Sequence, residues 1–204
     1  MTIALIDYGA GNLHSVHNAL RAAGATDVVI TADAEVVRAA DRIVLPGVGA
    51  FRACIEPLKA IPGMVTAMRE AVFDRGQPFL GICVGMQLLA EAGEEFGRHE
   101  GLGWIPGTVR LMERDDPTIK VPHMGWNDVV LARPPPLAVA GEAYFLHSYH
   151  FEAGDPADVI ATTDHGGPLV AAIGRDTLLG VQFHPEKSQA YGLATLARFL
   201  EWKP

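Results

Sequence analysis

The chain has 204 residues, of which 49% are hydrophobic and 20% are charged. This composition excludes intrinsic disorder and collagen-like repeats, and the length favours one compact domain over residues 1–204. Its 16 Lys and Arg against 24 Asp and Glu give a net charge of −8. The chain therefore lacks the basic surface expected of a nucleic-acid binder or of a protein held at an anionic membrane.

Short apolar runs alternate with amphipathic segments in the first half of the chain. Asn12 suits the N-cap of a helix that begins near Leu13, and Gly24 stands where a helix-ending glycine belongs. Further helices are predicted over 64–74 and 86–91. The predicted strands are 3–6, 28–31, 42–45 (ended by Pro46-Gly47) and 78–82. This alternation predicts a parallel sheet with helices on both faces.

The second half changes to short strands joined by Gly, Pro and Asp turns. Such spacing favours antiparallel strands added to the sheet, and we expect an α/β fold with a central, mostly parallel sheet. A last helix carries Leu193, Leu196 and Leu200 on one face. The proline run at 134–136 is interpreted as a stiff turn rather than a domain linker. The predicted strands are 109–112, 128–131, 144–147, 159–163, 169–173 and 178–183.

The sequence favours a cytoplasmic protein. The apolar run at 3–6 ends at Asp7, which is too short for a signal peptide, and no run of about 18 apolar residues occurs. Two cysteines, Cys54 and Cys83, are too few for a disulfide framework.

The clearest chemical signal surrounds Cys83, which has glycines two residues before and two residues after it. This pattern is typical of a nucleophile elbow, a strained turn that projects a reactive side chain at the carboxyl edge of a sheet. The helix that follows would supply amide donors and positive partial charge to a thiolate. Cys54 has no flanking glycines and is interpreted as a buried packing residue.

His184 is the best candidate for the base that a thiol nucleophile needs. It follows the predicted strand 178–183, so it and Cys83 both leave the carboxyl ends of strands, where open α/β sheets place their sites. Pro185 keeps the chain extended, which puts His184 and Glu186 on one side as a base and its orienting carboxylate.

The segment Pro46-Gly47-Val48-Gly49 is the candidate for oxyanion binding. Its two glycines let the backbone present the Val48 N–H to a developing negative charge. The amide of Val84, the residue after the nucleophile, would be a second donor.

Two other interpretations are weaker. The glycines at 9 and 11 suggest a dinucleotide-binding loop, but His14 stands where the third glycine belongs. His14 with His17, or His147 with His150, could form metal-binding pairs, but no third ligand has suitable spacing. We therefore expect no cofactor and no metal.

Several segments resemble one known family. GICVGMQ at 81–87 and HPEK at 184–187 are similar to segments of the class I, triad-type glutamine amidotransferases, which have a flavodoxin-like fold. Other segments narrow the resemblance to the glutaminase subunits of imidazole glycerol phosphate synthases, in histidine biosynthesis. These segments are 7–16, 45–51, 101–107, 121–127 and 147–151.

The resemblance implies a chemical role for each triad residue. Cys83 would attack the side-chain amide of L-glutamine and form a thioester, His184 would transfer protons, and Glu186 would orient His184. The residues implied to hold the glutamine are Gly49, Gln87, Ser148 and Tyr149.

The same resemblance implies a heterodimer with a separate (β/α)₈-barrel cyclase subunit, which receives the ammonia. Asn12 and Lys187 are the positions expected at that interface. His150 stands where the family frequently has Tyr, and Val84 where it often has Leu. Three alternatives stay open: a glutaminase that serves another ammonia-using synthase, a flavodoxin-like cysteine hydrolase, and a binding module in which Cys83 is inert.

Overall fold

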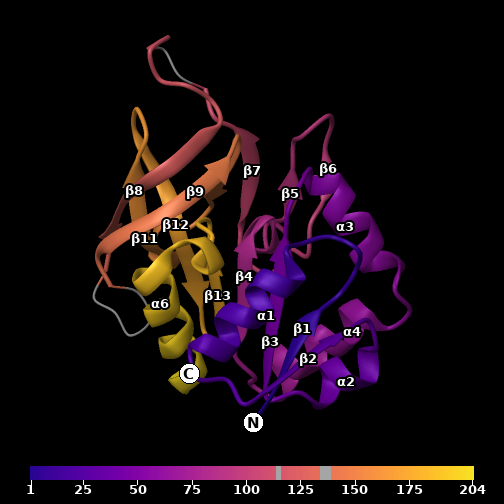
Figure 1. The fold of residues 1–204 in the computed structure, drawn as a ribbon. Coiled ribbons are helices and arrows are strands. Elements are labelled where there is room, and N and C mark those ends of the chain that lie inside the picture. The colour runs from indigo at the N-terminus through magenta and orange to yellow at the C-terminus, as the bar shows by residue number, and fades with distance from the viewer. Residues whose placement is uncertain (114–115, 134–138) are drawn as a thin grey trace.

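The computed structural model describes residues 1–113, 116–133 and 139–204 (Figure 1). The proline run at 134–136 lies outside them. The helical elements are α1 (Leu13–Ala22), α2 (Ala34–Ala39), α3 (Phe51–Ala60), α4 (Met64–Arg69), η1 (Glu70–Asp74), α5 (Val84–Gln87), η2 (Pro156–Asp158), η3 (Pro185–Lys187) and α6 (Gln189–Glu201). The strands are β1 (Thr2–Ile6), β2 (Asp27–Thr31), β3 (Arg42–Gly47), β4 (Phe79–Cys83), β5 (Ala92–Gly93), β6 (His99–Glu100), β7 (Gly107–Leu111), β8 (His123–Leu131), β9 (Gly141–His147), β10 (Tyr149–Ala153), β11 (Val159–Asp164), β12 (Pro168–Arg175) and β13 (Leu178–Val181).

The central sheet has nine strands in the order β2-β1-β3-β4-β13-β12-β11-β8-β9. The strands from β2 to β13 in this order run parallel, whereas those from β12 to β9 are antiparallel. The predicted α/β fold, in which antiparallel strands extend a parallel sheet, is confirmed, and the antiparallel part is as large as the parallel part. A smaller sheet has the order β10-β7-β5-β6. The strand predicted at 109–112 thus belongs to this separate sheet, because β7 pairs with β10 and β5 and not with the central sheet.

Helices cover the parallel half of the central sheet. α1 packs beside α6, and α2 packs beside α4 (Figure 1). The connections from β1 to β2 and from β2 to β3 run in opposite directions along the sheet, so right-handed crossovers place α1 and α2 on opposite faces. β3, β4 and β13 are accordingly buried along their whole length, as parallel strands covered on both faces should be.

Two local predictions were wrong. β3 does not stop at Pro46-Gly47 but continues through both residues, because its pairing with β4 extends to Gly47. The helix predicted over 86–91 is only the single turn α5, because the carbonyls of Leu88 and Leu89 accept hydrogen bonds from the loop at 102–105 instead of continuing the helix. The helix predicted over 64–74 is confirmed, as α4 continued by a π-helical turn at Glu70–Asp74.

The end of α1 agrees with its prediction, but its start agrees only in part. Gly24 follows the helix with φ of 111°, a left-handed conformation that glycine adopts without strain. Asn12 occupies the N-cap position, yet its side chain makes no capping hydrogen bond. Among the described residues, no helix is long and apolar enough to cross a membrane.

Candidate active site

Cys83 ends β4 in a strained backbone conformation, with φ of 54° and ψ of −113°. A side chain in such a sparsely populated region costs about 1–3 kcal/mol, which the surrounding structure must offset. A Cβ atom on Gly81 would lie 2.6 Å from the Gly85 carbonyl oxygen, and one on Gly85 would lie 1.9 Å from the Leu45 carbonyl oxygen. The two glycines therefore allow the turn and its close approach to β3, as an elbow requires.

The helix after Cys83 contributes less than the sequence analysis expects. α5 has four residues, so its dipole is small. The sulfur also has a polar side-chain neighbour in Gln182, whose Nε2 atom lies 3.7 Å from Sγ. Gln182 is completely buried. Sequence analysis missed this residue, although a glutamine within the apolar run 178–183 was the available signal.

His184 and Glu186 form a buried pair just beyond β13. The Nδ1 atom of His184 lies 2.8 Å from Oε1 of Glu186, and their side chains are 4% and 1% exposed. The predicted pairing is present, but the backbone route differs from the prediction. Only His184 is extended, whereas Pro185–Lys187 fold into a 3₁₀ turn. The Ser188 hydroxyl donates to the His184 carbonyl oxygen at 2.7 Å and so fixes this turn.

The surroundings of His184 favour its charged form. Burial lowers the pKa of the imidazole, but hydrogen bonds with the Cys83 thiol and the Glu186 carboxylate outweigh burial and raise this pKa to about 9. An imidazolium beside the sulfur stabilises a thiolate, which is the nucleophilic form of cysteine. The structure thus brings Cys83, His184 and Glu186 together as one chemical unit.

A pocket of about 430 Å³ opens beside this unit. Cys83, His184 and Lys187 line it together with other residues singled out from the sequence. These are Val48, Gly49, Val84, Gln87, Ser148 and Tyr149.

The predicted oxyanion segment lies against the elbow. Gly47 pairs with Cys83 in the register of β3 and β4, so Val48 follows directly beyond the paired strands. Gly49 has φ of 97°, and a Cβ atom there would meet no atom within 4 Å. Glycine at position 49 is therefore favoured by the backbone conformation and not by crowding.

Gln87 connects the elbow to the opposite pocket wall. Its Nε2 atom donates to the Tyr149 carbonyl oxygen and to Oε1 of Gln182, both at 3.0 Å. The amide nitrogen of Gln87 is thus engaged within the protein, which leaves the carbonyl end of its side chain to face a ligand.

Two histidines continue this hydrogen-bond network, and one of them, His147, also lines the pocket. The Nδ1 atom of His147 lies 2.9 Å from the Tyr149 carbonyl oxygen, which can only accept, so His147 carries its proton on Nδ1. Its Nε2 atom then accepts from Nδ1 of His123 at 3.1 Å, and Nε2 of His123 accepts from the Asn127 amide at 3.0 Å. Burial lowers the pKa of His147 to about 3, so this ring is neutral at pH 7.

Both ring nitrogens of His147 are occupied, which argues against the metal pair considered from the sequence. Among the described residues, no group of three or more His, Cys, Asp or Glu side chains could hold a metal ion.

Glu95 is a pocket residue that sequence analysis missed. It places a carboxylate on the pocket wall, and its Oε2 atom accepts a hydrogen bond from the Phe51 amide at 2.7 Å. The sequence contained no signal for it, since two glutamates in a turn resemble a solvated surface.

Only one of the two expected interface residues lines the pocket. Lys187 is exposed and lines the pocket, and its Nζ atom lies 5.8 Å from the centre of the Tyr144 ring. Asn12 belongs to the loop before α1. This loop contacts the oxyanion segment, because a Cβ atom on Gly11 would lie 3.0 Å from Cγ of Pro46.

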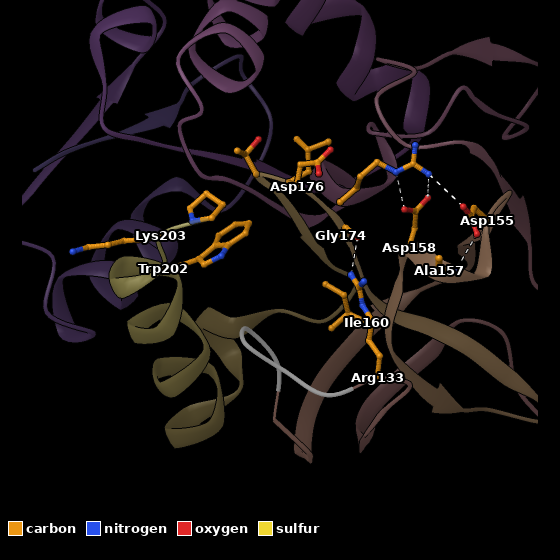
Figure 2. A pocket seen from close by; sticks show the side chains of 13 residues that line it. Arg133, Asp155, Ala157, Asp158, Ile160, Gly174, Asp176, Trp202 and Lys203 are labelled. Atoms are coloured by element: carbon orange, nitrogen blue, oxygen red, sulfur yellow. Dashed lines mark hydrogen bonds and ion pairs between the residues drawn. The ribbon is translucent and has the colours of Figure 1, made fainter.

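A larger cavity, of about 760 Å³, lies by the amino end of β13 (Figure 2). Its charged groups are largely paired within the protein. Arg175 makes two hydrogen bonds to Asp158, at 2.8 and 2.7 Å, and Arg133 donates to the Gly174 carbonyl oxygen at 2.9 Å (Figure 2). No residue of the triad lines this cavity, so its size does not make it the active site.

Residues 4–201 match the family described as glutamine amidotransferase class-I. The chain belongs to this family and is a glutamine amidotransferase.

Over its whole length the chain is 61% identical to the imidazole glycerol phosphate synthase subunit HisH of Zymomonas mobilis, of which the match covers 97%. It is 53% identical to the HisH subunit of Rhodospirillum rubrum, with both chains covered completely.

Solved structures of low sequence identity share the fold. A structure described as glutamine amidotransferase aligns with a TM-score of 0.77 at 17% identity, over 98% of each chain. PurLQS from Thermotoga maritima aligns with a TM-score of 0.72 at 17% identity, over 98% of this chain and 97% of the other.

Proposed function

We propose that this chain is the glutaminase subunit of imidazole glycerol phosphate synthase. It hydrolyses L-glutamine to glutamate and ammonia and delivers the ammonia to a separate barrel-shaped cyclase subunit. The observation that carries the proposal is the buried Cys83–His184–Glu186 unit at a pocket of about 430 Å³, in a chain 61% identical to a HisH subunit over its whole length.

The triad supports hydrolysis through a thioester. The Cys83 thiolate attacks the side-chain amide carbon of glutamine, and the carbonyl oxygen becomes an oxyanion. His184 gives its proton to the amide nitrogen, the carbon–nitrogen bond breaks, and ammonia leaves. The neutral imidazole then takes a proton from water, whose oxygen attacks the thioester and releases glutamate and the thiolate. Glu186 orients the imidazole and stabilises its charged form throughout.

Oxyanion stabilisation is assigned to the backbone amides of Val48 and Val84. Both residues line the pocket, and they belong to the two segments that flank the sulfur. Donors positioned for the developing charge contribute a large part of such a rate enhancement.

Charge complementarity suggests how glutamine is oriented. Glu95 supplies a carboxylate on the pocket wall for the α-ammonium group of the substrate. Ser148, between β9 and β10, and Tyr149, the first residue of β10, contribute backbone groups, and Gly49 keeps the adjoining wall free of a side chain.

The partner surface is assigned to Lys187 on the pocket wall and to Asn12 in the loop before α1. Two large apolar side chains are exposed on β8: Met124 is 62% exposed and Trp126 is 47% exposed. They pair in register with Leu146, which lines the pocket, and with Tyr144, whose ring lies below Lys187. Apolar side chains at this exposure favour burial by another protein. A partner that contacts the loop before α1 would also act on the oxyanion segment, because Gly11 packs against Pro46.

Co-purification with a barrel cyclase from the same genome tests the proposal. We expect a stable heterodimer whose cyclase reaction proceeds with glutamine as the nitrogen source. Expression of the pair in a histidine auxotroph that lacks both subunits should restore growth. A heterodimer that uses ammonium salts but not glutamine would overturn the glutaminase assignment, and failure to form any heterodimer would overturn the choice of partner.

A further inference from the structure

Tyr8 and Cys54 flank the oxyanion segment, and the hydrolysis steps above give neither of them a role. Tyr8 follows β1 and is 5% exposed, and Cys54 lies in the first turn of α3 and is completely buried. They come from different elements of the fold, yet both approach residues 46–49.

Each of the two side chains binds a backbone carbonyl of this segment. The Tyr8 hydroxyl donates to the Pro46 carbonyl oxygen at 2.6 Å, in a fully buried hydrogen bond. The Cys54 thiol donates to the Val48 carbonyl oxygen at 3.3 Å. The hydroxyl and the thiol also interact with each other.

The two carbonyls belong to different peptide groups. The Pro46 oxygen belongs to the peptide that joins Pro46 to Gly47, and the Val48 oxygen to the peptide that joins Val48 to Gly49. The peptide between them carries the Val48 N–H. The two side chains thus hold the peptide planes before and after the proposed oxyanion donor, and neither binds the donor's own peptide.

Packing adds to the constraint on the first of these peptides. A Cβ atom on Gly47 would lie 2.7 Å from the Gly85 backbone nitrogen and 3.0 Å from the Tyr8 hydroxyl oxygen. Gly47 is therefore enclosed between Tyr8 and the elbow. Of the three successive peptides, the one between Gly47 and Val48 is the one that neither Tyr8 nor Cys54 binds.

We propose that Tyr8 and Cys54 are positioning residues that aim the Val48 N–H at the oxyanion by fixing the peptides on either side of it. The inference rests on the proposed glutaminase function. Neither side chain touches the substrate, so both act on the formation of the tetrahedral intermediate and not on the binding of glutamine.

The chemistry of the two donors predicts effects of different size. A phenol hydroxyl is a strong donor, whereas a thiol is a weak one. Loss of an oxyanion donor lowers the rate by about 10²–10³, so a donor that is present but less well oriented should lower it by less. We expect Tyr8→Phe to lower kcat about tenfold and Cys54→Ala about threefold, with KM for glutamine unchanged within about twofold. Cys54→Ser keeps a hydrogen-bond donor and should recover most of the loss.

The test uses the heterodimer with its cyclase and measures kcat and KM for glutamine hydrolysis. Tyr191→Phe is the matched control, because the Tyr191 hydroxyl also donates to a backbone carbonyl, that of Val139 at 2.8 Å, away from the pocket. The rate at which iodoacetamide alkylates Cys83 is measured for the same variants, with the modified residue identified by mass spectrometry. This displacement forms no oxyanion, so Cys83 of Tyr8→Phe should be alkylated at the wild-type rate.

The inference is supported if kcat falls in Tyr8→Phe while KM, the alkylation rate and the Tyr191→Phe control stay near wild type. It is overturned if kcat of Tyr8→Phe equals that of the control, or if turnover and alkylation fall together, which would indicate a general packing role. Should Tyr8→Phe not fold, the comparison of Cys54→Ala with Cys54→Ser decides by the same criteria. A wild-type heterodimer without glutaminase activity would overturn the proposed function and this inference with it.

Discussion

Gly47 and Cys83 are direct partners in the parallel register of β3 and β4. The peptide between Gly47 and Val48, which follows the paired part of β3, therefore lies beside Cys83, the strained last residue of β4. This relationship places the Val48 N–H group next to the proposed nucleophile, and it explains why the continuation of β3 through Pro46 and Gly47 matters for the proposed chemistry.

Val48→Pro removes this N–H group while Cys83, His184 and Glu186 stay in place. Because one oxyanion donor is lost, we expect glutamine hydrolysis in the heterodimer to fall by about 10²–10³. Rates are compared with and without the cyclase subunit and a cyclase ligand. The wild-type free subunit should be nearly inactive, since the donor peptide can adopt either orientation until a partner biases it. If the partner stimulated Val48→Pro as fully as the wild type, the proposed reorientation of the Gly47–Val48 peptide would be contradicted.

Cys83→Ala should abolish glutamine-dependent turnover, because no other group at the pocket can form the thioester. The heterodimer should still use added ammonium salts at the wild-type rate, since the cyclase reaction occurs on the other chain. Both rates are measured on the same preparation, so the ammonium-dependent rate controls for folding. Glutamine-dependent turnover above trace level in Cys83→Ala would refute the assignment of the nucleophile.

The two other triad positions should differ in the size of their effects. His184→Ala removes the proton-transfer group and should eliminate almost all glutamine hydrolysis. Glu186→Gln keeps an imidazole at position 184 and weakens only its orientation and charge, so its loss in kcat should be smaller. Single-turnover kinetics with glutamine give both values. A loss in Glu186→Gln as large as in His184→Ala would assign Glu186 a direct chemical role.

Glu95→Gln removes the charge that we assign to the α-ammonium group and keeps an oxygen that can accept from the Phe51 amide. A hydrogen bond to a charged group contributes about 1.5–3 kcal/mol, so KM for glutamine should rise roughly 10- to 100-fold with kcat little changed. Glu94→Gln is the matched control, because Glu94 forms ion pairs with Arg98 and Arg110 and does not line this pocket. Equal KM values in the two variants would show that Glu95 does not bind the substrate.

The raised pKa of His184 predicts a pH dependence of stability. Its folded-state pKa of about 9 lies above the ordinary histidine value of about 6.5, so its contribution is complete below pH 6.5 and is lost as pH rises through about 9. A shift of this size corresponds to at most about 3 kcal/mol. Thermal unfolding between pH 6.5 and 9.5 should therefore show a steeper loss of Tm in the wild type than in His184→Gln. Parallel Tm curves for the two proteins would show that His184 is not charged in the folded state.

The sequence predicted the parts of the site whose geometry is local. The elbow at Cys83 depends on glycines two residues away, and the pairing of His184 with Glu186 depends on neighbours in one turn. The length of α5 was not predictable in this way, because its end is set by hydrogen bonds to the loop at 102–105. α2 was missed because its six residues are too few to show a helical period.

The residues that sequence analysis missed reach the site through tertiary contacts. Glu95 enters the pocket on a turn between the short strands β5 and β6, and β5 is placed by pairing with β7 from later in the chain. Tyr8 approaches Pro46 because β1 and β3 are adjacent strands, which chain order does not reveal. Such contacts depend on the sheet order β2-β1-β3-β4, and the spacing of residue types does not encode it.

The proton positions along His123 and His147 restrict which residues could stand there. Every hydrogen bond in that row points from Asn127 toward the Tyr149 carbonyl, so each intervening side chain has to accept at one end and donate at the other. Lysine and arginine only donate, and an ionised carboxylate only accepts, so a single replacement by any of them would break the row at one of its two ends. Positions 123 and 147, which support the pocket wall at Tyr149, can therefore accept only side chains that donate one hydrogen bond and accept another.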